Sequence, residues 1–426
     1  MTYTDQTKPD FTFIHMADTH LGLNWPAIGR YEKIQIPVYG KAFGAIVDAA
    51  IEKQVDFVIH AGDLVNRPRP PTAAWNRILQ ELPRLRKAGI PFVVTVGSHD
   101  KPESYFDRAG GDVLQLLDSR LDLAKRVDAD QNPFVNLRTR GGKKVAIYGL
   151  GDHGHEQEES LQQLTKHMTQ ESDFSILVMH GSVSTISPLI GPTIKTEKIS
   201  ELLSKRYVDY VALGHNHKRW EHKDLHIYNP GSPEFTSFAD APTLDYVMEG
   251  STLKEETRKV AEHGYYFVEV RGEILNAQYH HMLTRDVKNV QIRFNNATPS
   301  QVVEGTKQAI IKNASSSSIV RPLLKGTLHP STSRSQLDIR EILSLRERML
   351  FLEYPMVDLG GSQVEIESVQ GSDFRQLINQ YFKSRLGKPA EEITEITVKL
   401  VQLYSQKSKT TDQEALSLID GWNTND

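Results

Sequence analysis

Residues 11–22, "FTFIHMADTHLG", run from an apolar segment straight into two side chains that can bind a metal ion. Residues 11–17 have the aromatic and β-branched content of a buried strand. Asp18 and His20 follow in an Asp-x-His pattern at the point where this strand ends. A single pair is weak evidence, because polar residues after an apolar run also suit an ordinary turn.

The same arrangement recurs after four more apolar runs of the chain. The predicted strands and the residues that follow them are 56–61 with Asp63, 91–96 with Ser98 and His99, 175–179 with His180, and 209–213 with His215 and His217. In an α/β sheet the strand ends on one side open into a common crevice. Five such ends in series therefore predict that these side chains meet at one site.

The chemistry of this set indicates a metal centre. Carboxylates and imidazoles suit divalent manganese, iron or zinc, and the chain has no cysteine to favour copper(I) or an iron–sulfur cluster. Two carboxylates and four imidazoles exceed the needs of one tetrahedral ion, so we expect two ions that share one carboxylate. Two ions roughly 3.5–4 Å apart can clamp the oxygens of a phosphate during in-line displacement.

The pattern of strands and helices predicts a layered α/β fold with more than one domain. Helical periodicity lies between the strands, at residues 39–53, 72–87, 112–123, 157–170 and 196–205. The pattern resets near residue 287. We expect a first domain over residues 1–285, a small α/β domain over 286–360, a helical segment over 361–410 and a disordered tail over 411–426.

Composition limits the class of protein. The chain has 426 residues, a net charge of −4 and 38% hydrophobic residues, as expected for a soluble globular protein. No apolar run is long enough to cross a bilayer, and the absence of cysteine suits a reducing compartment, so we expect an intracellular protein. Local basic groups still allow nucleic-acid binding. The candidates are Arg67, Arg69, Lys218 and Arg219.

The order of these motifs resembles that of the calcineurin-like metallophosphoesterases. The details "HMADTHLG", "AGDLVNRPRPP", "GSHD" and "LGHNHKRW…YNPGSPE" look like those of the Mre-eleven double-strand-break repair nucleases, whose bacterial counterpart is SbcD. The resemblance is specific over the first ~240 residues and looser over the small following domain. It implies a layered β-sandwich core with flanking helices, followed by an α/β capping domain for DNA.

The resemblance also implies a role for each site residue. Asp18, His20 and His217 would hold one ion, His180 and His215 the other, with Asp63 bridging and Ser98 as a further ligand. His99 would assist departure of the sugar oxygen. The implied activity is manganese-dependent DNA cleavage, in exonuclease and single-strand endonuclease modes.

Two residues depart from the family pattern. The family has asparagine where this chain has Ser98, and a hydroxyl is a shorter and poorer ligand, so the second ion would be held less tightly or through a water. Three residues past Asp63, Asn66 replaces an aspartate or histidine that steadies the catalytic histidine. Asn66 and Asp100 are expected to support the site around its ligands.

Several other features have a plainer interpretation. His153 and His155 have ligand spacing but are predicted not to bind a metal, and His15 and His60 are predicted to be packed inside strands. The helices at 72–87 and 112–123 either pack on the sheet or, as the resemblance suggests, face a second copy in a homodimer. The apolar stripes at 373–386 and 391–406 either pack on each other or on the preceding domain or, as the resemblance implies, bind an ABC-type ATPase of the Rad-fifty/SbcC kind.

Three functions fit these residues. The leading one is a two-metal DNA nuclease of double-strand-break repair, in the cytoplasm with the nucleoid or in the nucleus. The alternatives are a phosphodiesterase for small nucleotides and a catalytically weak DNA-binding scaffold of the same fold. Ser98 and Asn66 keep the scaffold in consideration, whereas the extra domain favours a macromolecular substrate.

Overall fold

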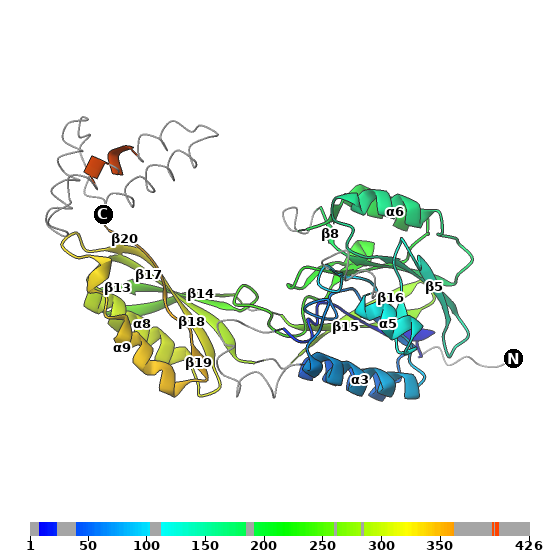
Figure 1. The fold of residues 1–426 in the computed structure, drawn as a ribbon, viewed down its shortest axis with the longest axis horizontal. Helices are drawn as coiled ribbons and strands as arrows, with labels where there is room; N and C mark the ends of the chain where they lie inside the picture. Colours follow the sequence, from blue (N-terminus) through cyan, green and yellow to red (C-terminus); the bar gives the residue numbers. More distant parts are fainter. Residues whose placement is uncertain are drawn as a thin grey trace, which may run out of the picture. The chain divides into compact units, whose positions relative to one another are not determined.

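The computed structural model describes residues 8–23, 40–102, 112–184, 191–259, 262–282 and 285–361, with a few positions at 394–395 and 397–399. Residues 1–360 and 361–426 form two separate compact units. The first unit contains three six-stranded sheets and one small two-stranded sheet, β8 (Ser182–Val183) with β9 (Thr193–Ile194). The strands and helices of this unit are drawn in Figure 1.

The first sheet carries the first three strands of the predicted site. Its order is β16-β15-β1-β2-β3-β4, and β1, β2 and β3 run parallel. The strands are β1 (Phe11–Met16), β2 (Phe57–His60), β3 (Phe92–Val94), β4 (Lys125–Arg126), β15 (Gly264–Arg271) and β16 (Ile274–His281).

The second sheet carries the remaining site strands. Its order is β11-β12-β10-β7-β6-β5, with β6, β7 and β10 parallel. The strands are β5 (Phe134–Arg138), β6 (Lys144–Leu150), β7 (Phe174–His180), β10 (Tyr210–Gly214), β11 (Trp220–His222) and β12 (Ile227–Asn229).

The alternation of side chains along β1 explains why two sheets stack. Phe11 and Phe13 point into a core shared with β7 and β10 of the second sheet, whereas Ile14 and Met16 point into a core shared with helices. Successive side chains of a strand face opposite sides, so a strand that is apolar on both faces must be covered on both. A layered sandwich follows from this pattern.

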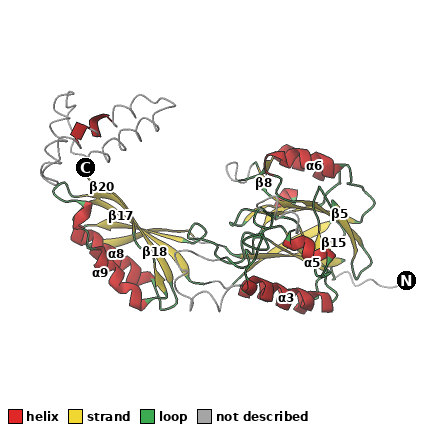
Figure 2. Cartoon of the chain, in the orientation of Figure 1, coloured by secondary structure: helices red, strands yellow, loops and turns green. Residues whose placement is uncertain are grey.

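Helices cover the two outer faces. The helices α2 (Lys41–Glu52), α3 (Thr72–Lys87) and α5 (Val113–Ser119) pack on the first sheet, while α6 (Gln157–Thr165) and α7 (Thr196–Ser204) pack on the second. Figure 2 shows α3 and α6 on opposite sides of the strands. The predicted fold class, a layered α/β sandwich with flanking helices, is confirmed.

The third sheet has the order β14-β13-β17-β18-β19, with β20 paired to β18. Its strands are β13 (Thr243–Glu249), β14 (Thr252–Lys259), β17 (Val287–Ala297), β18 (Ile319–Leu328), β19 (Phe351–Leu352) and β20 (Met356–Gly361). The hairpin β13–β14 precedes residue 286 yet belongs to this sheet, because β13 pairs with β17 in parallel. The chain then returns to the first sheet through β15 and β16.

Helices α8 (Pro299–Asn313) and α9 (Ile339–Leu343) lie on one face of the third sheet (Figure 2). Thr298 and Gln301 form a reciprocal capping box at the start of α8, and Pro299 occupies its first turn. Both features satisfy or remove backbone N–H groups that a helix start leaves without partners. The buried face of α8 then joins the core of β13, β17 and β18.

Some elements differ from the sequence-based predictions. The helix predicted at 112–123 is shorter, and α9 is flanked by two 3-10 helices, Arg334–Gln336 and Ser344–Arg348. Two further 3-10 helices lie at Gly154–Glu156 and Lys223–Leu225. Pro83 lies inside α3 and does not end it. The stripes predicted at 373–386 and 391–406 fall almost wholly outside the described residues.

Within the described part of the chain, no helix combines the length and the apolar character that crossing a membrane requires.

Candidate metal centre

The predicted ligands lie at the carboxyl ends of parallel strands in the two stacked sheets. Asp18 follows β1, Asp63 follows β2, His180 ends β7 and His215 follows β10. The backbone is left-handed at four of the site residues, with φ angles of 52° at Asp18, 43° at His20, 58° at Asp63 and 84° at His215. Such backbones are uncommon for residues other than glycine and are concentrated at functional sites.

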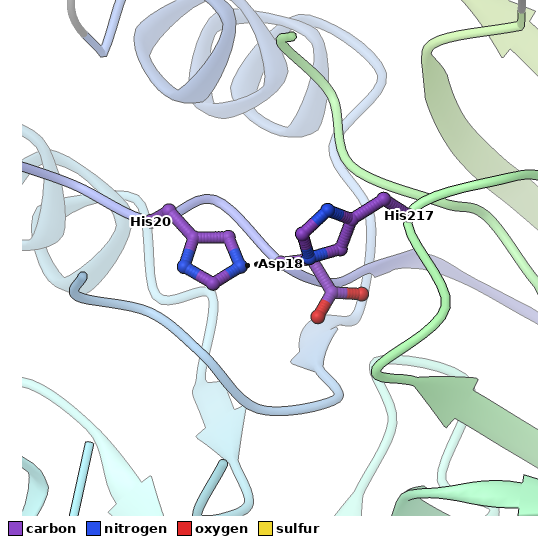
Figure 3. Close-up of side chains that lie close together, drawn as sticks. All are labelled: Asp18, His20 and His217. Carbon is purple, nitrogen blue, oxygen red and sulfur yellow. Dashed lines mark hydrogen bonds between the residues drawn. The ribbon is translucent and has the colours of Figure 1, made fainter. Parts of the chain in front are cut away.

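One group of ligand atoms comes from Asp18, His20 and His217. One atom from each lies within 4.8 Å of the others. The Nε2 atoms of His20 and His217 face each other at 3.1 Å, and the Asp18 carboxylate points toward the same space (Figure 3). These are the three residues for which the resemblance implies the first ion.

Asp63 lies between this group and the next. Its Oδ2 is 3.6 Å from His20 Nε2 and 3.4 Å from His180 Nε2, while its Oδ1 accepts a hydrogen bond of 2.8 Å from the His99 backbone N–H. The carboxylate therefore presents one oxygen to histidines from both groups. This is the position that a bridging ligand requires.

A second group consists of His180, His215 and Asp152, again with ligand atoms within 4.8 Å of one another. The two histidines were predicted, but Asp152 was not. A signal was present in the sequence, because Asp152 follows the apolar run of β6 as Asp63 follows that of β2.

Hydrogen bonds orient the histidines. His180 Nδ1 lies 2.8 Å from the carbonyl oxygen of Ala61, and His217 Nδ1 lies 2.7 Å from Thr236 Oγ1 and 3.4 Å from Asp240. An acceptor at Nδ1 fixes the ring and leaves Nε2 for a metal. Sequence reasoning missed Thr236 and Asp240, because neither belongs to a short motif with His217.

Asp100 joins the two loops that follow β2 and β3. Its buried carboxylate accepts hydrogen bonds from the backbone N–H groups of Asp63, Val65 and Gly97, at 2.9, 3.1 and 2.9 Å. A Cβ atom at Gly97 would lie 2.1 Å from Asp63 Oδ1 and 2.2 Å from Asp63 N, so only glycine allows this approach. Asp100 thus ties the loop that carries Asp63 to the loop that carries Gly97.

His99 is exposed beside the cluster, with its ring 4.7 Å from that of His20 between centroids. Its Nδ1 lies 3.0 Å from the main-chain carbonyl oxygen of Asn66. The sequence-based expectation assigned this support to the Asn66 side chain, whereas the structure assigns it to the backbone. The identity of the side chain at position 66 therefore matters less than expected. Ser98 is exposed in the same turn.

The charge states of the ligands differ, because burial keeps two histidines neutral, while the charges of Asp63 and Asp18 and hydrogen bonds with Asp63 and Ala61 outweigh burial at His180 and raise its pKa to about 10. Burial lowers the pKa of His20 to about 3 and that of His215 to about 4, so both rings are neutral near pH 7, the form that binds a metal. Burial acts most strongly and would raise the pKa of Asp63, but the charge and hydrogen bond of His180 together with the charges of His20 and His99 outweigh it and hold the pKa well below its usual range. Burial and the charge of Asp63 raise the pKa of Asp100 to about 7.

Buried histidine nitrogens that have no hydrogen-bond partner also indicate that the cluster can bind a metal. His180 Nε2 and His215 Nε2 are buried without a hydrogen-bond partner among the described residues. Buried polar atoms in native proteins nearly always have a partner, and a bound ion supplies one where the protein itself does not. The cluster of carboxylates and imidazoles is thus suited to divalent metal ions.

The other histidines have structural contacts. His153 Nε2 pairs with Asp128 at 2.8 Å, and His155 is exposed. The two nitrogens of His15 lie 3.0 Å from the Tyr210 hydroxyl and the Leu213 carbonyl, and His60 Nε2 lies 3.0 Å from Thr19 Oγ1. His15 and His60 are thus packed within the fold, and His153 has a partner outside the ligand groups.

The basic residues near the site differ in their surroundings. Arg67, Arg69 and Lys218 are exposed. Arg219 instead pairs with Glu221 at 3.0 Å and Glu262 at 2.9 Å, and its guanidinium lies over the ring of Tyr279. Its charge is balanced within the protein.

Most apolar residues of the predicted dimer helices are buried within the chain. Ile78, Leu82 and Leu85 of α3 and Leu114 and Leu117 of α5 belong to the core of the first sheet. Leu79 and Leu116 remain 47% and 39% exposed. Packing on the sheet thus accounts for most of both stripes, and the homodimer remains a prediction.

Residues 11–219 match the calcineurin-like phosphoesterase family. This stretch holds all of the ligand groups described above, except for the supporting residues Thr236 and Asp240. The chain therefore contains a calcineurin-like metallophosphoesterase domain.

Curated relatives are more specific. The chain is 31% identical over 207 residues to the DNA double-strand break repair protein Mre11 of Sulfurisphaera tokodaii, a match that covers 48% of this chain and 49% of the relative. It is 24% identical over 423 residues to the protein of the same name from Archaeoglobus fulgidus, covering 96% and 83%. It is also 26% identical to the uncharacterized metallophosphoesterase YhaO of Bacillus subtilis, covering 75% and 72%.

The matched stretch spans about half the length of the first of these relatives. The resemblance to Mre-eleven proteins is confirmed.

Proposed function

We propose that this protein is a two-metal, manganese-dependent DNA nuclease with exonuclease and single-strand endonuclease activity in double-strand-break repair. The observation that carries this proposal is Asp63, which faces histidines of both ligand groups and accepts a hydrogen bond from the backbone of His99. The relatives named for double-strand-break repair support DNA as the substrate.

The ligands divide between two ions. Asp18, His20 and His217 would hold the first and His180 with His215 the second, while Asp63, which faces histidines of both groups, would be shared between them. When bound, such a pair of ions polarises a phosphoryl oxygen and lowers the pKa of water. The left-handed backbones and the hydrogen bonds to Nδ1 hold the ligands in position before any ion arrives.

His99 would act at the departing sugar oxygen. Its Nδ1 is held by the Asn66 carbonyl, which leaves Nε2 for the substrate. The ring is exposed, unlike those of His20 and His180, so a phosphodiester can reach it. A protonated ring donates its Nε2 proton to the leaving oxygen, and this is general acid catalysis.

DNA would be held by basic residues around the site. A cavity of about 560 Å³ adjoins His217 and includes Lys218, Thr243 and His263 in its lining. We assign phosphate contacts to Lys218, Arg67 and Arg69 because they are exposed and lie next to the ligand loops. Arg219 is less suited to this role, since two carboxylates already balance its charge.

Partners complete the proposal. Residues 361–410 would bind an ABC-type ATPase of the Rad-fifty/SbcC kind, and the exposed Leu79 and Leu116 would face a second copy. A chain of residues 1–360, which is one compact unit, should keep its metal binding and lose the ATPase. Complex formation by this shortened chain would contradict the assignment.

The test is cleavage of DNA with added manganese. Circular single-stranded DNA, linear duplex, hairpin DNA and a small phosphodiester should be compared as substrates. Asp63→Asn should abolish cleavage, and Asp130→Asn, the same change on an exposed turn, should not. Cleavage of the small phosphodiester alone would favour the nucleotide phosphodiesterase, and DNA binding without cleavage would favour the scaffold.

A further inference from the structure

A sixth strand end belongs to the site. Strand β6 runs parallel to β7 in direct register, with Leu150 opposite Met179. Asp152 lies two residues beyond Leu150, and His180 lies one residue beyond Met179. Parallel strands end at the same edge of a sheet, so the two side chains reach the same crevice. A carboxylate oxygen of Asp152 lies within 4.8 Å of ligand nitrogens from both His180 and His215.

The loop that carries Asp152 is held on several sides. The Asp152 backbone N–H donates to the Val96 carbonyl at 2.9 Å, and the Gly151 N–H donates to Asp128 Oδ1 at 2.9 Å. Gln157 Nε2 donates to the Gly151 carbonyl at 3.0 Å. A Cβ atom at Gly151 would lie 2.8 Å from the Val96 oxygen, so position 151 has no room for a side chain.

The second ligand group needs this charge. Apart from the shared Asp63, its other members are the imidazoles of His215 and of the fully buried His180, and the Nε2 atom of each is buried with no hydrogen-bond partner among the described residues. A divalent ion held by imidazoles and half of one carboxylate retains most of its positive charge. A second carboxylate offsets that charge, and carboxylates are favoured ligands of manganese and similar ions.

We propose that Asp152 is a ligand of the second metal ion and supplies the negative charge that the hydroxyl of Ser98 does not. This inference rests on the metal centre proposed above. It assigns the acidic residue of the "GDHGH" loop to the site, while His153 of the same loop is bound to Asp128.

Lys101 provides a variant with the opposite effect. Its Nζ lies 3.7 Å from Asp152 Oδ1, and the Gly154 N–H donates to the same oxygen at 3.0 Å. An ammonium group beside a ligand carboxylate competes with a bound cation and repels it. Lys101→Met should therefore tighten binding of the second ion, whereas loss of Asp152 should weaken it.

The experiment measures manganese binding by the full-length protein after removal of metal with a chelator. Calorimetry gives the number and affinity of the ions, and electron paramagnetic resonance reports free manganese and the magnetic coupling between bound ions. Asp152→Asn should weaken the affinity for the second manganese ion by at least ~10–100-fold, which is the usual effect of changes around a metal site. It should also reduce the resonance signal that comes from two magnetically coupled ions. The first equivalent should keep its affinity.

Glu156→Gln is the matched control, because it removes one charge from the exposed part of the same loop. Thermal unfolding in chelator shows whether each variant is folded. If Asp152→Asn is not folded, Lys101→Met decides: a several-fold tighter second ion supports the inference, and unchanged or weaker binding overturns it.

Two failures can be told apart. If a folded Asp152→Asn variant binds both manganese ions with unchanged affinity, or with affinities that are weakened equally, Asp152 has no specific role at the second ion. The metal centre itself still stands in that case, provided that Asp63→Asn loses metal. Absence of metal binding by the natural sequence would overturn the centre itself.

Discussion

At the scale of single residues, His99 is the position at which a catalytic role and a metal-binding role can be told apart. The ring contacts the Asn66 carbonyl and lies edge-on to His20, but it is exposed where the other histidines of the cluster are buried or half-buried. One nitrogen of His99 also lies within 4.8 Å of ligand atoms from His20 and Asp63. Geometry alone therefore allows two roles, a proton donor or a ligand.

We expect His99→Ala to slow DNA cleavage by ~10²–10⁴-fold, the usual contribution of a general acid. Metal content should stay unchanged, because each ligand group retains its other members. Cleavage rates and metal analysis of the purified variant provide the measurement, with His155→Ala as the control, since His155 is exposed on a loop. Loss of a metal ion on mutation would make His99 a ligand instead.

At the scale of elements, the loops after β2 and β3 act as one unit. Asp100 in the second loop accepts backbone hydrogen bonds from the first, and Gly97 allows the loops to touch. The position of Asp63 thus depends on a residue more than thirty positions away. Short-range sequence patterns do not report such a dependence.

Gly97→Ala should disrupt this contact without changing any charged group. The added Cβ would lie 2.1 Å from Asp63 Oδ1, so the loop must move and Asp63 with it. We expect a loss of manganese binding and a fall in stability of ~1–3 kcal/mol, the usual cost of overpacking. Calorimetry and urea denaturation measure the two effects.

Gly142→Ala is the control for Gly97→Ala. Gly142 has φ +85° but open space around its Cβ position, so it reports backbone strain without a steric contact. It should leave manganese binding unchanged. Equal metal affinity in both variants would show that the close approach of the two loops is not needed.

At the scale of the whole molecule, the stacking of two sheets buries His15. One ring nitrogen lies 3.0 Å from Tyr210 of the opposite sheet and the other 3.0 Å from the Leu213 carbonyl. Burial lowers the pKa of His15 from 6.5 to about 3. The folded protein therefore holds this ring neutral over a range of pH in which the unfolded chain binds a proton.

The sign of the pH effect follows from this difference. Below pH 6.5 the unfolded state takes up a proton that the folded state does not, so stability should fall as the pH falls from 6.5 towards 3. The slope from one such group is up to about 1.4 kcal/mol per pH unit. Urea denaturation in chelator between pH 7.5 and 4.5 measures it.

His15→Gln cannot take up this proton. The variant should be less stable than the natural protein at pH 7, because the contacts with Tyr210 and Leu213 are weakened, but its stability should depend less steeply on pH. Identical slopes would mean that His15 is not the group that titrates.

Much of the fold and site could be read from local patterns. The apolar run of β1 and the Asp-x-His after it predict a strand that delivers ligands, and helix α3 has the predicted bounds. These features depend on residues that are near one another in the sequence, so propensity and periodicity report them. The hairpin β13–β14 shows the limit, because its pairing with β17 joins segments more than forty residues apart.

What the sequence determined by itself was the chemistry: carboxylates and imidazoles, without thiols, placed after a series of buried strands. What only the tertiary structure decided was which of them share a site and what holds them. Asp152 approaches His180 because β6 lies beside β7, His217 is oriented by Thr236 and Asp240, and the backbone of Asn66 supports His99. Each of these contacts spans a long loop of chain, and its closure is stabilised by the whole core and by no local pattern.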